Sequence, residues 1–344
     1  MNITTQISKL KMFAAVFAIA TAFTSCDSVI YDGEGDCSVK YRIEFEYERN
    51  MEFADAFASK VSSVALYVFD ESGVLVEQMS ESGEALAADD YAMMLELEPA
   101  EYDLLAWCGV DGKSFTVPTA TVGQTTLDQM LCTMSRKSDA AGSYVDEDLS
   151  ALFHGLKRIN YTDEPGVHTE VLSLTKNTNN FRIILQQTWS EGSAAESVDV
   201  SKFDFAIIDD NGKMDYDNSV MEDEQIIYRP WDITTGEVDV DTDISTRANM
   251  VTVSVAELTT ARLMTDHHPI LVVTKKETGE KVLSVPIVDY ALLVKGNYNR
   301  NMDDQEYLDR QDEYNMTFFI HDGKWVSSQI IINSWRVVLN NEIL

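Results

Sequence analysis

The chain has 344 residues and carries 58 acidic against 26 basic side chains, a formal net charge of −32 at pH 7. Such a surface repels the phosphate backbones of nucleic acids and no basic patch offsets this, so we expect no nucleic-acid partner. Hydrophobic residues make up 45% of the chain, and Gly and Pro are sparse. This composition indicates packed cores and excludes a disordered acidic tail.

The first 25 residues have the order of a secretory signal. Lys9 and Lys11 precede an apolar run from Met12 to about Phe23, and small polar residues follow. A transmembrane helix is disfavoured, because spanning a bilayer takes about 20 apolar residues. The segment therefore predicts export.

Cys26 directly follows one hydrophobic and two small residues, which resembles the cleavage site of a bacterial lipoprotein signal. In such proteins the cysteine thiol receives diacylglycerol and becomes the new N-terminus. We predict a signal peptide over 1–25, a covalent lipid on Cys26 and an acidic spacer over 26–36. The alternative is a soluble secreted protein cut nearby. Apart from the lipid we expect no cofactor.

The remaining residues exceed what one hydrophobic core usually organises, so two domains are expected. The polar sequence TDEPG, Thr162 to Gly166, has the composition of a boundary. We place an N-terminal domain over 37–165 and a C-terminal domain over 166–344.

The N-terminal domain has the alternation of strands. Residues 37–48 place apolar side chains on one face and charged ones on the other, which predicts a strand with one wet face. Residues 64–78 read strand, polar turn with Gly73, strand, and predict a β-hairpin. Further elements are expected in this order: a strand over 91–97, a strand over 102–108 and a short helix over 125–134.

The C-terminal domain repeats this design. Residues 178–189 alternate again, and 203–214 repeat the strand, Asp-x-x-Gly, strand arrangement of the first hairpin. The later predicted strands cover 269–274, 281–288, 315–320 and 329–339. The whole pattern predicts an all-β fold of two tandem antiparallel β-sandwich domains.

Three cysteines remain besides Cys26, in a compartment that permits disulfides. Cys37 opens one predicted strand and Cys108 closes another, so these two residues are our candidate disulfide. The alternative is three buried free thiols. Cys132 is expected to be free in either case.

No metal site or catalytic site is expected. Asp239, Asp241 and Asp243 alternate as in a calcium loop, but the sequence lacks the Gly and Glu of an EF-hand. His267 and His268 are adjacent and would diverge on a strand. No catalytic motif groups a nucleophile, a base and an orienting residue, so we expect no enzyme and no small-molecule substrate.

The most polar constellation is QEYLDRQDEYNMTFFI, Gln305 to Ile320, where acidic residues and Arg310 lie between two tyrosines. One interpretation is a carboxylate site positioned by arginine. The favoured interpretation is a polar turn whose ion pairs and tyrosines fix the start of a strand.

Several stretches together resemble the FimB-type fimbrial anchor family of Bacteroidales, the minor anchoring subunits of type V pili. They are the lipoprotein start, CSVKYRIEFEYERNM, VALYVFDESGVLV, EPAEYDLLAWCG, QEYLDRQDEYNMTFFI and INSWRVVL. The resemblance covers nearly the whole chain in the right order. It implies two transthyretin-like sandwich domains in a lipid-anchored protein of the outer membrane, exposed at the cell surface at the base of a fimbrium.

The resemblance also implies fimbrial stalk subunits as partners, joined by strand exchange. The candidate donor strand is the C-terminal one, in which Ile331, Trp335, Val337 and Leu339 lie, with Asn333, in one row of residues at a spacing of two. The alternative, slightly preferred for an isolated chain, is that this segment is the last strand of the second sandwich.

A second functional class is a surface lipoprotein adhesin that binds glycan or host protein through loops. Tyr228, Pro230 and Trp231 are the aromatic loop residues that would serve it.

Overall fold

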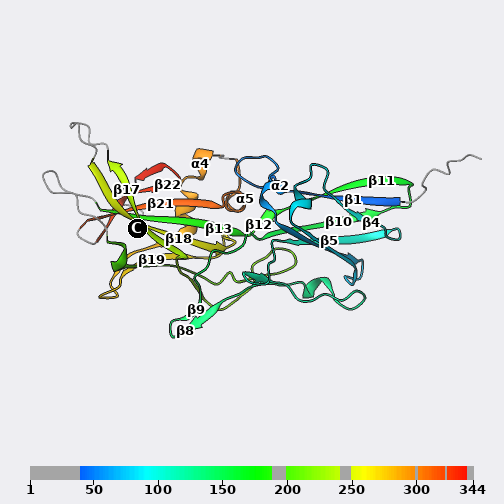
Figure 1. Ribbon diagram of the computed structural model, residues 1–344, viewed down its shortest axis with the longest axis horizontal. Coiled ribbons are helices and arrows are strands. Elements are labelled where there is room, and N and C mark those ends of the chain that lie inside the picture. The colour runs from blue at the N-terminus through cyan, green and yellow to red at the C-terminus, as the bar shows by residue number, and fades with distance from the viewer. Residues whose placement is uncertain (1–38, 188–198, 241–248, 299–300, 322–323, 339–344) are drawn as a thin grey trace, which may run out of the picture.

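The computed structural model describes residues 39–187, 199–240, 249–298, 301–321 and 324–338. They form an elongated, mostly β molecule in which two sandwiches lie end to end (Figure 1). The predicted all-β fold is confirmed. None of the helices in these ranges has the length and apolar character needed to cross a membrane.

The N-terminal sandwich packs a three-stranded sheet against a five-stranded one. The first has the order β11 (Gly166–Ser173), β1 (Val39–Glu46), β4 (Met93–Leu95). The second has the order β12 (Thr175–Lys176), β10 (Phe153–Tyr161), β5 (Ala100–Cys108), β2 (Ser63–Asp70), β3 (Leu75–Ser82).

The alternation in β1 explains why this strand lies over the core. Tyr41, Ile43 and Phe45 are buried and share one apolar cluster with Leu66 and Leu104 of the facing sheet. The charged residues between them point away, as the period of a strand requires.

The first predicted hairpin, β2–β3, is confirmed. Asp70 Oδ1 accepts hydrogen bonds from the backbone N–H groups of Ser72 and Val74, each at 2.9 Å. Gly73 has φ +76, a conformation that Gly adopts without strain.

The C-terminal sandwich has two six-stranded sheets. One has the order β17 (Asp232–Val240), β18 (Asn249–Ala261), β13 (Thr178–Gln187), β21 (Glu313–His321), β22 (Lys324–Ile332), β23 (Trp335–Val338). The other has the order β20 (Lys281–Pro286), β19 (Ile270–Lys275), β14 (Phe203–Asp209), β16 (Ile226–Tyr228), β9 (Gly142–Val145), β8 (Lys137–Asp139). A three-stranded sheet has the order β15 (Lys213–Met214), β7 (Cys132–Met134), β6 (Phe115–Thr116) and combines strands from both halves of the sequence.

Three of the sheets are mixed, whereas the sequence predicted antiparallel ones. β1 pairs in parallel with β11, and β13 pairs in parallel with β21. In each sandwich an early strand therefore lies parallel to a late strand. This shared topology supports the inference of two related domains.

The second predicted hairpin, over 203–214, is wrong. β14 pairs with β16 and β19, whereas β15 pairs with β7. The Asp-x-x-Gly sequence here joins two strands of different sheets, because the partners of each strand lie elsewhere in the chain.

The predicted domain boundary at 165 is also wrong. TDEPG is only the turn between β10 and β11, and β11 completes the N-terminal sandwich beside β1. In addition, β7 and β9 precede this boundary but pair with β15 and β16 of the C-terminal half. The two halves therefore interleave.

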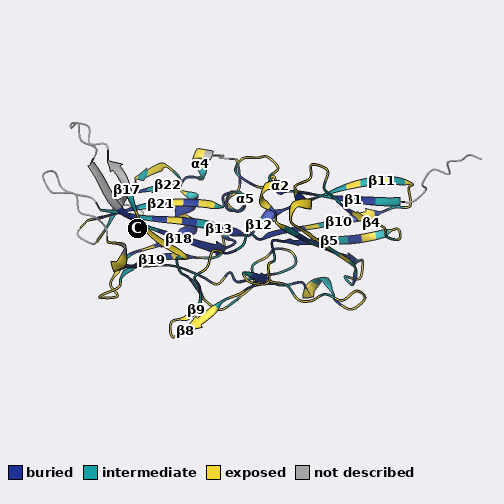
Figure 2. Cartoon of the chain, viewed as in Figure 1, coloured by how far each residue is buried: buried dark blue, intermediate teal, exposed yellow. Residues whose placement is uncertain are grey.

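The helices in the described ranges are short. They are α2 (Phe57–Lys60), η1 (Glu84–Ala87), η2 (Leu127–Gln129), η3 (Val200–Lys202), α3 (Ile287–Leu292), α4 (Lys295–Tyr298) and α5 (Asp304–Arg310). The predicted helix over 125–134 is limited to η2, which Thr126 and Gln129 cap reciprocally. Figure 2 shows burial concentrated on the strands along the long axis, whereas the β8–β9 hairpin projects from the molecule and its strand β8 is exposed.

Candidate functional site

The stretch QEYLDRQDEY lies at the junction of the two sandwiches, where it forms α5 and the start of β21. Asp309 on α5 is 3% exposed and receives hydrogen bonds from Arg262 Nε and Nη2, each at 2.9 Å. Such a two-point pair is both strong and directional. The carboxylate is satisfied, which agrees with the ion pairs of the favoured interpretation. The polar turn of that interpretation is instead helix α5.

Arg310, the neighbour of Asp309, joins the C-terminal sandwich to the N-terminal one. Its guanidinium donates to the backbone carbonyls of Glu48 at 2.8 Å and Asn50 at 3.3 Å. It also lies 4.7 Å from the centroid of the Phe53 ring. These contacts span the junction and fix the two halves relative to each other.

A buried histidine lies at the same junction. His154 Nε2 is 2.7 Å from the Tyr216 carbonyl, and since a carbonyl only accepts, this nitrogen carries the proton. The ring packs edge-on against Trp107, with centroids 4.7 Å apart. Burial lowers the pKa of His154 to about 4, with nearby Arg262 acting in the same direction. The side chain is therefore neutral at pH 7.

The N-terminal end of the described chain lies at the end of the molecule remote from this junction. Tyr161 Oη donates to the Val39 carbonyl at 3.1 Å, and Tyr161 pairs with Ala100 at the start of β5. From Val39, β1 runs inward toward the segment that contacts Arg310. Cys26, the predicted lipid attachment residue, lies outside the described residues.

The predicted disulfide is not supported. Cys108 and Cys132 are free and buried, and burial raises the pKa of both thiols, that of Cys132 to about 12. Cys108 ends β5, eight residues from Ala100, which places it about 26 Å from the end at which Val39 lies. Its predicted partner, Cys37, lies outside the described residues.

The C-terminal segment forms a hairpin and not the single predicted strand. Asn333 and Ser334 have φ +46 and +71, so the chain reverses between β22 and β23. Ile332 pairs with Trp335 across this turn. The donor residues Ile331, Trp335 and Val337 therefore do not lie along one strand, and Leu339 lies outside the described residues.

Within this hairpin, β22 belongs to the core and β23 is an edge. Ile330 and Ile332 are fully buried, whereas Trp335 is 43% and Val338 is 66% exposed. In the described part of the chain β23 has a strand on one side only. An apolar, exposed edge strand is the kind of surface to which another chain adds.

The aromatic loop residues do not form one patch. Tyr228 is fully buried and its hydroxyl contacts Asn211 Oδ1, whereas Trp231 is 42% exposed at the start of edge strand β17. Of the acidic triplet, Asp241 and Asp243 lie outside the described residues.

Comparison with known proteins shows which protein family has this architecture. A family model described as fimbrillin-A associated anchor proteins Mfa1 and Mfa2 matches residues 34–341. The chain belongs to this family. The minor fimbrium anchoring subunit Mfa2 of Porphyromonas gingivalis is 23% identical over 335 residues, which cover 94% of this chain and 93% of that protein.

Solved structures share the fold. A proposed adhesin from Bacteroides thetaiotaomicron has 31% identity and a TM-score of 0.76 over 88% of this chain and 98% of that one. A proposed polysaccharide-binding protein from the same organism has 30% identity and a TM-score of 0.74, over 89% and 99%. The fimbrial anchor protein Mfa2 of Porphyromonas gingivalis has a TM-score of 0.64 at 18% identity, over 88% and 100%.

Proposed function

We propose that this protein is the lipid-anchored base of a fimbrium: Cys26 tethers it to the outer membrane, and its C-terminal sandwich holds the first stalk subunit. Membership of the anchor family gives the class of function. The lipid, the membrane and the strand contact are our inferences for this chain, and the role requires no catalysis.

The observation that carries the proposal is the placement of the two ends. The chain enters the fold through β1 at one end of the long axis, and β23 lies in the sandwich at the other end (Figure 1). A subunit held at β23 would therefore point away from a membrane that holds the residues before β1. The contacts of Arg310 with the Glu48 and Asn50 carbonyls span the junction and keep the two attachment points apart.

The strand contact is proposed for β23 and not for β22. Removing β22 would expose Ile330 and Ile332 and empty part of the core, at a cost of about 2–5 kcal/mol for each side chain lost. β23 is short, and two of its four side chains are apolar and exposed. It can pair with a strand of a stalk subunit without disturbing the core.

The lipid tether is tested with Cys26→Ala. Fimbriae are counted on washed cells and in the culture medium, and the abundance and export of the variant are measured in parallel. We expect fimbriae to move from the cells into the medium. Fimbriae that stay attached in normal numbers, with the variant stable and exported, would refute the anchor proposal.

The strand contact is tested with two matched edge variants. Val338→Lys places a charge on β23, and Ile233→Lys places one on β17, where Ile233 is 37% exposed. We expect only Val338→Lys to release fimbriae. Deletion of Ser334 to Leu344 should act in the same way, and normal attachment with a folded deletion variant would exclude β23 as the contact.

A second candidate function is adhesion through the β17 edge. Trp231 and Ile233 are exposed there, and relatives at 30–31% identity are described as adhesin or polysaccharide-binding proteins. An adhesin would lose glycan or host-protein binding in Trp231→Ala while fimbriae stay attached. Unchanged binding in this variant would exclude the surface.

A further inference from the structure

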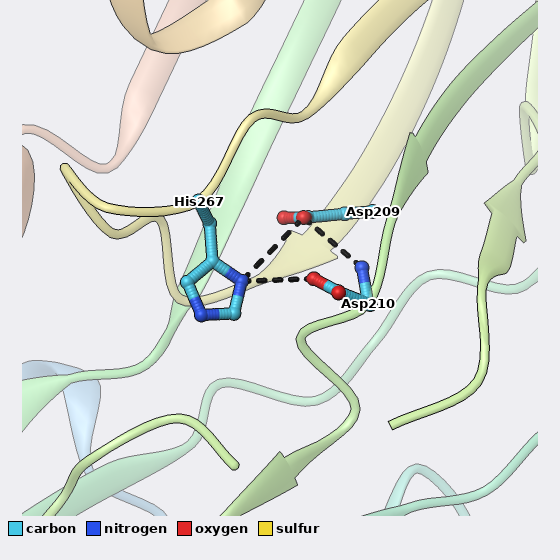
Figure 3. A group of neighbouring side chains, drawn as sticks. All are labelled: Asp209, Asp210 and His267. Atoms are coloured by element: carbon cyan, nitrogen blue, oxygen red, sulfur yellow. Dashed lines mark hydrogen bonds and ion pairs between the residues drawn. The ribbon is translucent and has the colours of Figure 1, made fainter. Parts of the chain in front are cut away.

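Three side chains with metal-binding atoms meet where β14 ends. Asp209 is the last residue of β14, Asp210 follows it, and His267 lies in the turn between β18 and β19. His267 Nδ1 is 2.9 Å from Asp210 Oδ1 and 3.9 Å from Asp209 Oδ1. Figure 3 shows the imidazole and both carboxylates directed toward one point.

This group was not predicted from the sequence, because His267 and His268 were expected to lie next to each other on a strand with their side chains on opposite faces. In the structure both residues lie in the turn, and His267 contacts Asp210, which precedes it by 57 residues and directly follows β14. The sequence feature that could have indicated a site here is the pair Asp209-Asp210 at the end of an apolar strand.

The burial of Asp209 is evidence for a ligand that does not depend on the clustering of the three side chains. The residue is only 6% exposed, and its Oδ2 is buried without a hydrogen-bond partner. Both of its carboxylate oxygens lie on the side of the His267 ring (Figure 3). Oδ1 accepts from the Asp210 backbone N–H at 3.0 Å, which leaves Oδ2 as the oxygen without a partner. A buried carboxylate oxygen without a partner is costly, and a bound cation would offset that cost.

The donor set and the spacing fit a zinc-class ion. Zinc binds imidazole nitrogen and carboxylate oxygen at about 2.0–2.2 Å, so its ligand atoms in a tetrahedral site lie about 3.3–3.5 Å apart. The two distances from His267 Nδ1 fall on either side of this value. Calcium and magnesium prefer oxygen ligands alone, so the imidazole disfavours them.

The surroundings also favour a cation with an open coordination position. The cluster lines a surface cleft of about 610 Å³, to which Glu222, Asp223 and Asp266 add acidic groups and Lys281 a basic one. Asp223 is already paired with Arg136 at 2.6 Å. Water from the cleft could fill a fourth position, as at zinc sites with three protein ligands.

We propose that Asp209, Asp210 and His267 bind one divalent transition-metal ion of the zinc class. The ion joins the end of β14 to the turn between β18 and β19. It replaces the direct contact between His267 and Asp210, and both groups bind it in their deprotonated forms.

The test is calorimetric titration of the purified, metal-stripped mature protein with ZnCl2, in 0.15 M salt with millimolar MgCl2 to suppress unspecific binding to the acidic surface. We expect one zinc ion per chain, bound at least tenfold more tightly than CaCl2. His267→Ala and Asp210→Asn should each weaken zinc binding by about tenfold or more. The control is His168→Ala, in the N-terminal sandwich, which should bind as the wild type does.

Two results would overturn the proposal: no zinc binding above that of His267→Ala, or binding that survives both cluster variants. Asp210 is half exposed, so Asp210→Asn serves if His267→Ala fails to fold, as judged by circular dichroism. Zinc should also raise the thermal midpoint of the wild type and not that of the variants.

Discussion

The buried His154 predicts a specific loss of stability in acid. Its pKa is lowered to about 4 in the folded protein, mainly by burial, against about 6.5 when unfolded. The unfolded state therefore binds more protons between these values. The stability contributed by the neutral ring is complete above about pH 6.5 and is lost progressively as the pH falls from about 6.5 to about 4.

The two pKa values set the magnitude. The linkage relation gives a loss of about 2 kcal/mol between pH 7 and pH 5, and about 3 kcal/mol once the folded form also titrates. The charged groups near the ring are Arg262, which lowers the pKa, and Asp217, which raises it. Burial is the larger effect, so the sign of the prediction does not depend on them.

The assay is urea unfolding at pH 7 and pH 5, followed by tryptophan fluorescence because Trp107 contacts the ring. His154→Gln does not titrate and can still donate to the Tyr216 carbonyl. We expect the wild type to lose about 2 kcal/mol more than this variant between the two pH values. Equal losses in both proteins would refute the reasoning.

Three further changes test other parts of the structure. Asp309→Ala leaves the buried Arg262 charge unpaired and should lower the free energy of unfolding by about 3–5 kcal/mol. An unchanged urea midpoint would contradict a stabilising role for the Arg262–Asp309 pair. Ser334→Gly relieves a left-handed conformation in the last hairpin and should raise stability by about 0.5–1 kcal/mol in thermal unfolding, whereas a loss would argue against the turn. Gly109→Ala would place Cβ 1.9 Å from the Ala151 carbonyl oxygen at φ +79, so soluble yield and stability should fall, by at least about 2 kcal/mol.

The sequence predicted those elements whose evidence is local. The alternation around Ile43 and the turn at Gly73 identify β1 and the β2–β3 hairpin, because each signal comes from residues within one element. The pairing of β9 with β16 depends on contacts between distant segments, so no local pattern could reveal it.

The site residues divide in the same way. The turn at Asn333 and Ser334 was missed because both residues adopt positive φ without being Gly. His267 was missed because its partners precede it by more than fifty residues. The preference for an ion pair over a ligand site at Asp309 agrees with its contact to Arg262, because an acidic residue beside arginine and tyrosine more often forms an internal ion pair.

The parallel pairing of β1 with β11 has a mechanical consequence. A pull on the residues before Val39, directed along the long axis, would draw β1 lengthwise past its neighbours. The hydrogen bonds along the eight paired residues, from Val39–Gly166 to Glu46–Ser173, would then carry the load together. Loading across a strand would instead break them one after another. The chain thus enters the fold through a strand suited to resist tension, a load that the proposed position between a cell and a filament would impose.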